Sequence, residues 1–335
     1  MIKMLPFLNL SQTYKALEVE IDVAIKNVLL SGEYVLGEET SNFENEWAKF
    51  CHAKHAVGLG NGLDALTLSL KALGIGEDDE VIVPANTYIA TWLAVSNCGA
   101  TPIPVEPEQK SMNIDYKKIE GEITENTKAI IPVHLYGQPA DLSEINKIAK
   151  KHGLWIVEDA AQCHGASYHK RPIGSHSDVV AWSFYPSKNL GCFGDGGAIT
   201  TNSTALSKRI QQLRNYGSTK KYRNEIIGFN SRLDPIQAAI LRVKLKHLKK
   251  WNEQRSVIAQ LYLSKLQTLP LTLPSVLPKR TSVWHQFVIR TPLRDELQNA
   301  LTKAGIQTLI HYPVPPFSQK AYDNFKKTFT SSITS

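Results

Sequence analysis

Three residues with useful chemistry follow two short apolar runs near the middle of the chain. Asp159 follows the run at 155–158, Ser183 lies near the end of the run at 179–184, and Lys188 comes five residues after Ser183, ahead of glycines at 191, 194, 196 and 197. In α/β sheets, ligands bind just past the carboxyl ends of strands. A lysine there can form an imine with an aldehyde cofactor, and a neighbouring carboxylate can keep a pyridine nitrogen protonated. Together they would make an electron sink.

Each residue taken singly also has an ordinary explanation. An isolated turn lysine is usually solvated, and an aspartate at such a place often caps a turn or a helix. Their combination favours the chemical interpretation. The segment Asn61-Gly62-Leu63 opens a predicted helix and offers backbone N–H groups and a helix dipole to a phosphate, although Asn61 could serve only as an N-cap. The glycines at 191–197 do not form a dinucleotide-binding motif, so we interpret them as turns around Lys188.

These residues need a sheet to position them, and the hydrophobic pattern predicts one. Helical spacing of apolar residues from Leu17 to Leu29 predicts a helix closed by Ser31-Gly32, and a second helix is expected from Asn61 to Leu73. Short β-branched runs lie at 81–83, 129–133, 155–157 and 179–184. Strands that are apolar on both faces and alternate with helices indicate a covered parallel sheet, so the fold class is α/β.

A change in composition and in the pattern of predicted elements after residue 205 predicts a second, smaller domain. The sequence becomes basic and helix-rich, and a proline-punctuated stretch at 271–278 introduces an α/β segment with strands expected at 284–290 and 306–310 around a helix at 293–303. We predict a large domain at residues 1–245 and a small domain at 246–335. The Ser/Thr-rich end at 328–335 has no apolar periodicity, so the small domain is expected to be shortened there.

Composition excludes several classes of protein. The chain has 335 residues, 42% of them hydrophobic, and no apolar run approaches the ~18 residues of a membrane helix. The four cysteines form no CxxC pair, so we expect neither disulfides nor a metal site. The net charge of +7 suits anionic ligands. The basic residues are densest at 242–250, where they alternate with leucine and valine, so we interpret this segment as a solvated helix face rather than a nucleic-acid surface. The amino-terminal sequence lacks a cleavage signal, so a cytoplasmic protein is expected.

Seven segments, in the same order along the chain, resemble the DegT/DnrJ/StrS family of sugar aminotransferases. They are GLGNGLDAL (58–66), VPANTYIAT (83–91), PVHLYGQPAD (132–141), VEDAAQCHGASY (157–168), SFYPSKNLGCFGDGGAI (183–199), GFNSRLDPIQAAIL (228–241) and IHYPVPP (310–316). The resemblance implies the aspartate-aminotransferase-like fold (fold type I), in which a large domain with a mostly parallel mixed sheet between helices carries a smaller C-terminal α/β domain. It also implies pyridoxal 5'-phosphate as cofactor and a homodimer with shared active sites.

The resemblance assigns roles to residues that match the family's motifs. Lys188 would hold the cofactor as an imine and then transfer the substrate proton, and Asp159 would pair with the pyridinium nitrogen. The other implied cofactor contacts are Gln162 to the phenolic oxygen, Gly62, Leu63 and Ser183 to the phosphate, Asn230 to the phosphate from the partner subunit, and Tyr88 stacked on the ring. The implied sugar-nucleotide contacts are Tyr185, Lys221, His311 and Tyr312. A core position for Tyr88 and simple solvation for Lys221 remain the alternatives.

The stretch NGLDAL resembles the version found in enzymes that aminate carbon 3, and the stretch at 86–100 is similar to enzymes that make dTDP-3-amino-3,6-dideoxyhexoses. The expected reaction is transamination of a dTDP-3-keto-6-deoxyhexose with L-glutamate as donor and 2-oxoglutarate as product. The implied pathway supplies a bacterial surface polysaccharide such as the O-antigen of lipopolysaccharide. Amination at carbon 4 and a non-enzymatic scaffold protein are the alternatives; Lys188 argues against the dehydrating branch, which has histidine there.

Overall fold

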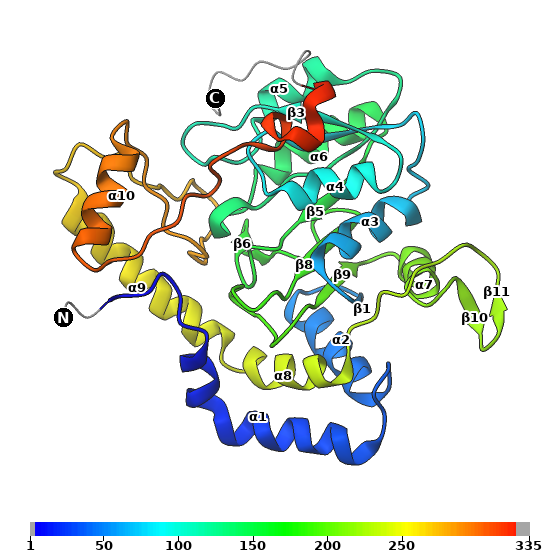
Figure 1. Cartoon of the computed structure of the whole chain (residues 1–335). Coiled ribbons are helices and arrows are strands. Elements are labelled where there is room, and N and C mark those ends of the chain that lie inside the picture. The colour runs from blue at the N-terminus through cyan, green and yellow to red at the C-terminus, as the bar shows by residue number, and fades with distance from the viewer. Residues whose placement is uncertain (1–3, 326–335) are drawn as a thin grey trace.

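The computed structural model describes residues 4–325 and is built around one seven-stranded sheet (Figure 1). Its strand order is β1-β9-β8-β5-β4-β2-β3. The strands span β1 (His55–Leu59), β2 (Glu80–Pro84), β3 (Thr101–Val105), β4 (Thr127–Ile130), β5 (Trp155–Asp159), β8 (Val179–Ser183) and β9 (Gly197–Thr201). The four strands predicted from sequence are therefore confirmed as β2, β4, β5 and β8.

The direction of the strands decides where loops gather. Pairings β3·β2, β2·β4, β4·β5 and β5·β8 are parallel, whereas β9 is antiparallel to both β8 and β1. Every strand of this sheet except β9 consequently ends at the same edge. The mostly parallel mixed sheet agrees with the expected α/β class, and it brings the ends of β1, β2, β4, β5 and β8 together.

Helices cover both faces of the sheet because consecutive side chains of its strands, which point to opposite faces, are apolar. One face packs against α3 (Gly62–Ala72), α4 (Ile89–Ser96) and α7 (Thr204–Leu213). The opposite face packs against α5 (Tyr116–Ile119) and α6 (Leu142–His152) at one end and α2 (Glu38–Phe50) and α8 (Pro235–Leu245) at the other. Along β2, for example, Val81 and Val83 face the first layer and Ile82 faces the second.

The predicted first helix is confirmed as α1 (Ser11–Ser31), which ends at Gly32 in the left-handed conformation, as predicted. It packs through Leu17 and Ile21 against Ile240 and Val243 of α8. The long helix α9 (Leu248–Leu266) then leads away from the sheet, and α10 (Arg294–Lys303) follows it in the chain on the same side of the molecule (Figure 1). Among the helices of residues 4–325, none has the length and hydropathy required to cross a bilayer.

The two strands predicted in the C-terminal part are wrong. Helix α10 forms where expected, but within the described residues 284–290 and 306–310 contribute only isolated pairs, Arg290 with Thr272 and Ile306 with Leu5. A strand ladder needs an extended neighbour over several consecutive residues. Trp284 moreover has a φ of +49°, outside the β region. The Ser/Thr-rich end discussed above lies outside the described residues.

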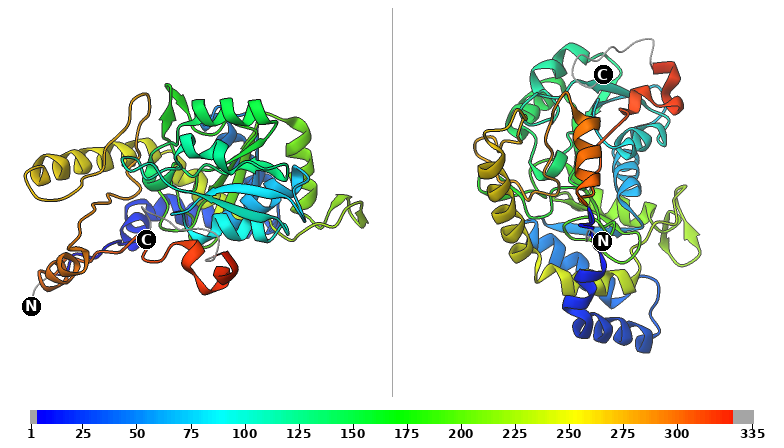
Figure 2. Two further views of the ribbon diagram at one scale, coloured as in Figure 1. Left: turned by 90° about the horizontal axis from the view of Figure 1, so that it is seen from above. Right: turned by 60° about the vertical axis from the view of Figure 1, so that its left-hand side comes forward.

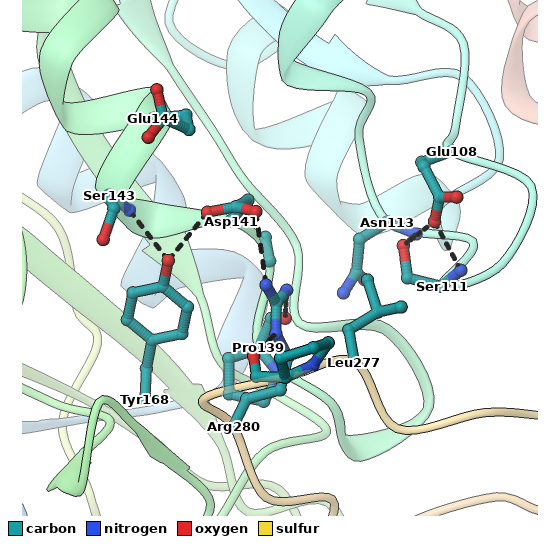
Figure 3. A network of polar contacts seen from close by, with 12 residues as sticks. Glu108, Ser111, Asn113, Pro139, Asp141, Ser143, Glu144, Tyr168, Leu277 and Arg280 are labelled. Atoms are coloured by element: carbon teal, nitrogen blue, oxygen red, sulfur yellow. Dashed lines mark hydrogen bonds and ion pairs between the residues drawn. The ribbon is translucent and has the colours of Figure 1, made fainter.

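Polar contacts fix the segment after α9 to loops of the sheet (Figure 3). The Arg280 guanidinium donates to Pro139 O at 2.9 Å and to Asp141 Oδ2 at 3.2 Å. The Tyr168 hydroxyl donates to the other oxygen of Asp141 at 2.7 Å, and the Arg280 guanidinium lies 5.2 Å from the centre of the Tyr168 ring. These contacts hold the segment around Arg280 against the loop that follows β4.

A buried ion pair joins α2 to the end of α7. Arg214 donates to Glu44 and, at 2.7 Å, to the carbonyl of Gly58 in β1, while Glu44 Oε1 accepts the Gly58 N–H at 2.7 Å. Both side chains are nearly inaccessible to solvent, at 10% and 12% exposed. Removing one partner of such a pair leaves an uncompensated buried charge.

We therefore expect Arg214→Met to lower the free energy of unfolding by about 3–5 kcal/mol. The matched control is Lys147→Met, which breaks the exposed pair with Glu144 on α6 and should cost less than about 1 kcal/mol. Chemical denaturation of both variants measures the difference. Equal losses would contradict the assignment of Arg214 and Glu44 as a buried pair that stabilises the fold.

Candidate active site

The edge where the parallel strands end carries the residues singled out from sequence. Asp159 is the last residue of β5 and Ser183 is the last residue of β8, its neighbour in the sheet. Asn61 follows β1, and Tyr88 follows β2 at the start of α4. Because all four strands point the same way, these side chains belong to one site.

Asp159 has a buried carboxylate, 6% exposed, that is held by two neutral donors among the described residues. The Thr91 hydroxyl donates to Oδ2 at 2.9 Å and the Ala161 N–H donates to Oδ1 at 3.1 Å. Burial raises the pKa of Asp159, and these two hydrogen bonds together with the charge of Lys188 oppose the rise. Such a carboxylate gains from a cationic partner, because desolvation disfavours its charged form.

Lys188 lies in the turn after β8, where its N–H donates to Tyr185 O at 2.8 Å. Burial lowers the pKa of the Lys188 ammonium, and the charge of Asp159 partly offsets that shift. The amine is therefore more readily neutral than that of a solvated lysine, as a nucleophile or a proton acceptor requires. The turn is tight: a Cβ at Gly191 would lie 2.6 Å from Tyr185 O, so glycine is required there.

A narrow space lies between the first turn of α3 and the end of β8. A Cβ at Gly62 would sit 2.6 Å from Ser183 Cβ and 3.1 Å from Ser183 Oγ, so this glycine keeps the helix start in close contact with the serine. Asn61 acts as the N-cap, because its Oδ1 accepts the Asp64 N–H at 2.8 Å. Leu63, the second residue of α3, packs partly on the core. The helix start and the serine hydroxyl form a cradle of donors suited to a phosphate.

Gln162 is oriented by a residue that the sequence did not single out. The Tyr136 N–H donates to Gln162 Oε1 at 2.6 Å, and Gln162 Nε2 then donates to the Tyr312 hydroxyl at 3.0 Å. Tyr136 has a φ of +60°, and its own hydroxyl donates to His311 O at 2.6 Å. Burial raises the pKa of Tyr136 to about 12, so the hydroxyl stays protonated. Tyr136 thus connects β4's loop to the segment around His311.

The aromatic residues expected at the site are present. Tyr88 and Tyr312 have ring centres 5.4 Å apart, and Tyr88 is 55% exposed, so a core position for Tyr88 is wrong. Tyr185 is also exposed, next to Ser183. His311 stacks on Phe7, and burial, together with the positive charge of Lys188, lowers its pKa.

Two predicted residues are not connected to this cluster within one chain. Lys221 lies in the hairpin of β10 (Ser218–Lys220) and β11 (Arg223–Asn224), which projects from the body of the molecule (Figures 1 and 2). Its ammonium lies 5.3 Å from the centre of the exposed Tyr222 ring. Asn230 is exposed and forms an isolated bridge with Asn215.

The sequence prediction missed Thr91 and Tyr136, although both lie within quoted motifs. Thr91 ends the segment VPANTYIAT and Tyr136 lies in PVHLYGQPAD. The signal available for Thr91 was its spacing of four residues from Thr87, which places two hydroxyls on one face of a helix start. Tyr136 offered no comparable signal, because the hydrogen bond from its hydroxyl to His311 O joins residues 175 positions apart.

Known proteins identify the family of this fold and site. Residues 15–334 match the model of the DegT/DnrJ/EryC1/StrS aminotransferase family. The chain belongs to this family. Its relatives include a dTDP-3-amino-3,4,6-trideoxy-alpha-D-glucose transaminase of Streptomyces venezuelae, 54% identical over 95% of this chain and 84% of the relative. A dTDP-3-amino-3,6-dideoxy-alpha-D-galactopyranose transaminase of Aneurinibacillus thermoaerophilus is 52% identical over 97% of this chain and 89% of its own length.

Solved structures of family members share the fold. DesV of Streptomyces venezuelae, in complex with a ketimine intermediate, superimposes with a TM-score of 0.95 at 54% identity, covering 96% of this chain and 87% of that one. NtdA of Bacillus subtilis, with bound cofactor PMP, has a TM-score of 0.93 at 33% identity, covering 100% of this chain and 78% of that one. The expected aspartate-aminotransferase-like fold is confirmed.

The close contact between Gly62 and Ser183 predicts how a larger side chain at Gly62 affects stability. Gly62→Ala should lower the free energy of unfolding by about 1–3 kcal/mol, because the new Cβ must displace α3 from β8. Gly121→Ala is the control, since nothing lies within 4 Å of its Cβ. Denaturation curves of the two variants test this, and an unchanged Gly62→Ala curve would show that the cradle is loose.

The opposing influences on Lys188 make a second prediction. Asp159→Asn should lower the pKa of the Lys188 amine further, since the carboxylate that favours the ammonium form is removed. Reductive methylation of the cofactor-free protein over a range of pH, followed by mass spectrometry of the Lys188 peptide, gives the midpoint in both proteins. A midpoint that rises in Asp159→Asn would contradict the interaction between the two charges.

Proposed function

We propose that the protein is a pyridoxal-phosphate-dependent transaminase that converts a dTDP-3-keto-6-deoxyhexose to the corresponding dTDP-3-amino-3,6-dideoxyhexose, with L-glutamate as amino donor. The observation that carries the proposal is the placement of Lys188 and Asp159 at one sheet edge of a chain that is 52% and 54% identical to two dTDP-3-amino-sugar transaminases. The family membership makes the transaminase class the first choice. The sugar follows from the two relatives and the carbon-3 type of motif at 61–66.

The residues at the site suit this cofactor. A Cβ at Gly62 would fill the space beside Ser183. Because glycine has none, the backbone N–H groups at the start of α3 lie close to the Ser183 hydroxyl, as a phosphate site requires. The buried carboxylate of Asp159 has neutral donors only among its described hydrogen-bond partners, so a protonated ring nitrogen would supply its missing cation. Because they belong to the donor cradle at the start of α3 and the end of β8, we assign Leu63 and Ser183 to the phosphate.

The bound cofactor supplies an electron sink that stabilises negative charge at the substrate carbon next to nitrogen. Lys188 acts there as the proton carrier. Its amine would carry the proton between that carbon and the cofactor, and the lowered pKa favours the neutral amine needed to accept the proton. The Asp159 carboxylate would hold the ring nitrogen protonated by its negative charge, and it would lose this function if it were itself protonated.

Gln162 has one amide N–H left to donate once its other contacts are made. Its oxygen is occupied by the Tyr136 N–H and one N–H donates to the Tyr312 hydroxyl, so the remaining N–H can serve the phenolic oxygen of the ring. Tyr88 presents an exposed aromatic face at the same opening, where it can stack on the ring.

The sugar nucleotide would enter through a cleft of about 440 Å³ next to the site, a volume that suits a small-molecule ligand. Arg290, Arg294 and His311 are among its lining residues, and positive charge there suits a diphosphate. Tyr185, His311 and Tyr312 would contact the hexose. Lys221 and Asn230 would reach the neighbouring site in a homodimer.

We place the boundary between the large PLP-binding domain and the small C-terminal domain at residues 245 and 246, between α8 and α9. Relative movement of the two would change the cleft that Arg294 of α10 helps to line. We also propose that the enzyme works in the cytoplasm and that its amino sugar is built into a surface polysaccharide such as an O-antigen.

The half-reaction with the donor tests the proposal directly. After addition of pyridoxal phosphate, the purified protein should develop a visible absorbance band, and L-glutamate should replace it by the band of the amine form of the cofactor. Lys188→Ala should not form the first band, because it lacks the amine. Glu253→Gln, a change on α9 outside the described cluster, is the control and should behave like the unmutated protein.

The second half-reaction distinguishes the substrates. The amine form should be consumed by a dTDP-3-keto-6-deoxyhexose much faster than by its 4-keto isomer, and the product identified by mass spectrometry and NMR. Faster reaction with the 4-keto sugar would move the amination to carbon 4. Absence of any cofactor band in the unmutated protein would favour the non-enzymatic alternative.

A further inference from the structure

We propose that Thr91 is a positioning residue for the reaction: with Thr87 behind it, its hydroxyl aims the Asp159 carboxylate and holds it ionised for the protonated ring nitrogen. The inference rests on the proposed function, because it concerns the partner of the cofactor's ring. Thr91 Oγ1 lies 2.9 Å from Asp159 Oδ2, and Thr87 Oγ1 lies 3.0 Å from Thr91 Oγ1.

The chemistry of the three groups determines which atom donates each hydrogen bond. An ionised carboxylate can only accept, and a hydroxyl has one proton. Thr91 must therefore donate its proton to Asp159, and the proton between the two threonines must come from Thr87. The two hydroxyls form a short row in which both O–H dipoles point toward the carboxylate, and each bond polarises the next.

Burial makes this row difficult to replace. Thr91 is 0% exposed, Thr87 is 1% exposed, and Asp159 lies beneath the start of α4. Thr91 is the third residue of that helix and Thr87 precedes it by one turn, so α4 and β5 together determine the geometry. Water has no access from this side to compensate a lost hydroxyl. Loss of the Thr91 hydroxyl would leave the buried Asp159 Oδ2 without this donor, which would destabilise the ionised form of Asp159.

The carboxylate keeps lone pairs for a ligand after these contacts. Oδ2 accepts one hydrogen bond from Thr91 and Oδ1 accepts one from Ala161, and a carboxylate has about four acceptor positions. The backbone donor at Ala161 is unaffected by substitution of side chains, so Thr91 is the donor that mutation can remove. A Thr91→Val variant keeps the shape and loses the proton.

The test compares two ligands that differ only at the ring nitrogen: pyridoxamine phosphate and its 1-deaza analogue, which carries a CH group in place of that nitrogen. Neither forms an imine with Lys188, so binding is measured at equilibrium by calorimetry on the cofactor-free protein. We expect Thr91→Val to weaken pyridoxamine phosphate about tenfold and to leave the analogue almost unchanged, because only the former needs a charged Asp159. Thr91→Ser, which restores a hydroxyl, should bind both like the unmutated protein.

Thr87→Val is the graded control, with an expected loss of about threefold for pyridoxamine phosphate, since Thr91 still donates to Asp159. A second readout is the ¹⁵N chemical shift of a labelled ring nitrogen, which should move toward the unprotonated value in Thr91→Val and stay in place in Thr91→Ser. Unfolding curves establish that the variants are folded; if Thr91→Val is not, Thr91→Ala replaces it.

Each outcome decides between the ideas. Equal weakening of the binding of both ligands by Thr91→Val would show that Thr91 only supports the shape of the pocket. Unchanged binding of both ligands would show that the hydroxyl has no influence. Either result would overturn the positioning role while the proposed function stands. Failure of the unmutated protein to bind either ligand would overturn the proposed function, and this inference with it.

Discussion

Burial of the Asp159 carboxylate is the constraint on which the site depends. Removing a carboxylate from water is unfavourable unless donors or a cation replace the solvent. The structure supplies two donors, the Thr91 hydroxyl and the Ala161 N–H, and leaves the cation to a ligand and to the nearby Lys188. The position of α4 against β5, the small residues after β5 and the turn at Lys188 are all consistent with that one requirement. Burial also lowers the pKa of Lys188, so the same buried environment favours a cationic partner for Asp159 and a neutral amine at Lys188.

The parallel sheet converts a set of distant motifs into one site. Six of the seven strands end at one edge, and the loops that follow them bring donors, rings and the lysine together (Figure 1). Glycine is needed where two of these loops approach each other most closely. A Cβ at Gly197 would lie 2.3 Å from Asn61 O, so β9 could not pack beside the start of α3 with any other residue. The sheet thus sets the direction of the side chains and the glycines set the distances between their backbones.

Tyr136 shows how the later part of the chain is tied to this edge. Its left-handed backbone turns its N–H toward Gln162 and its hydroxyl toward His311 O, so one residue orients the amide and fixes the segment that carries His311 and Tyr312. Positive φ in a tyrosine is unusual and is maintained here by tertiary contacts. The network of Asp141, Tyr168 and Arg280 fixes the preceding segment in a similar way.

The sequence by itself determined the α/β class, the strands β2, β4, β5 and β8, the helices that begin at Ser11 and Gly62, and the pairing of a lysine with a carboxylate, because hydrophobic period and motif spacing are local properties. The tertiary structure decided the rest. Strands at 284–290 and 306–310 require neighbours that are distant in sequence, and these supply only single pairs. Thr91 and Tyr136 acquire their importance from contacts across 68 and 175 residues. No local pattern reports such contacts, because they depend on how whole strands and helices pack.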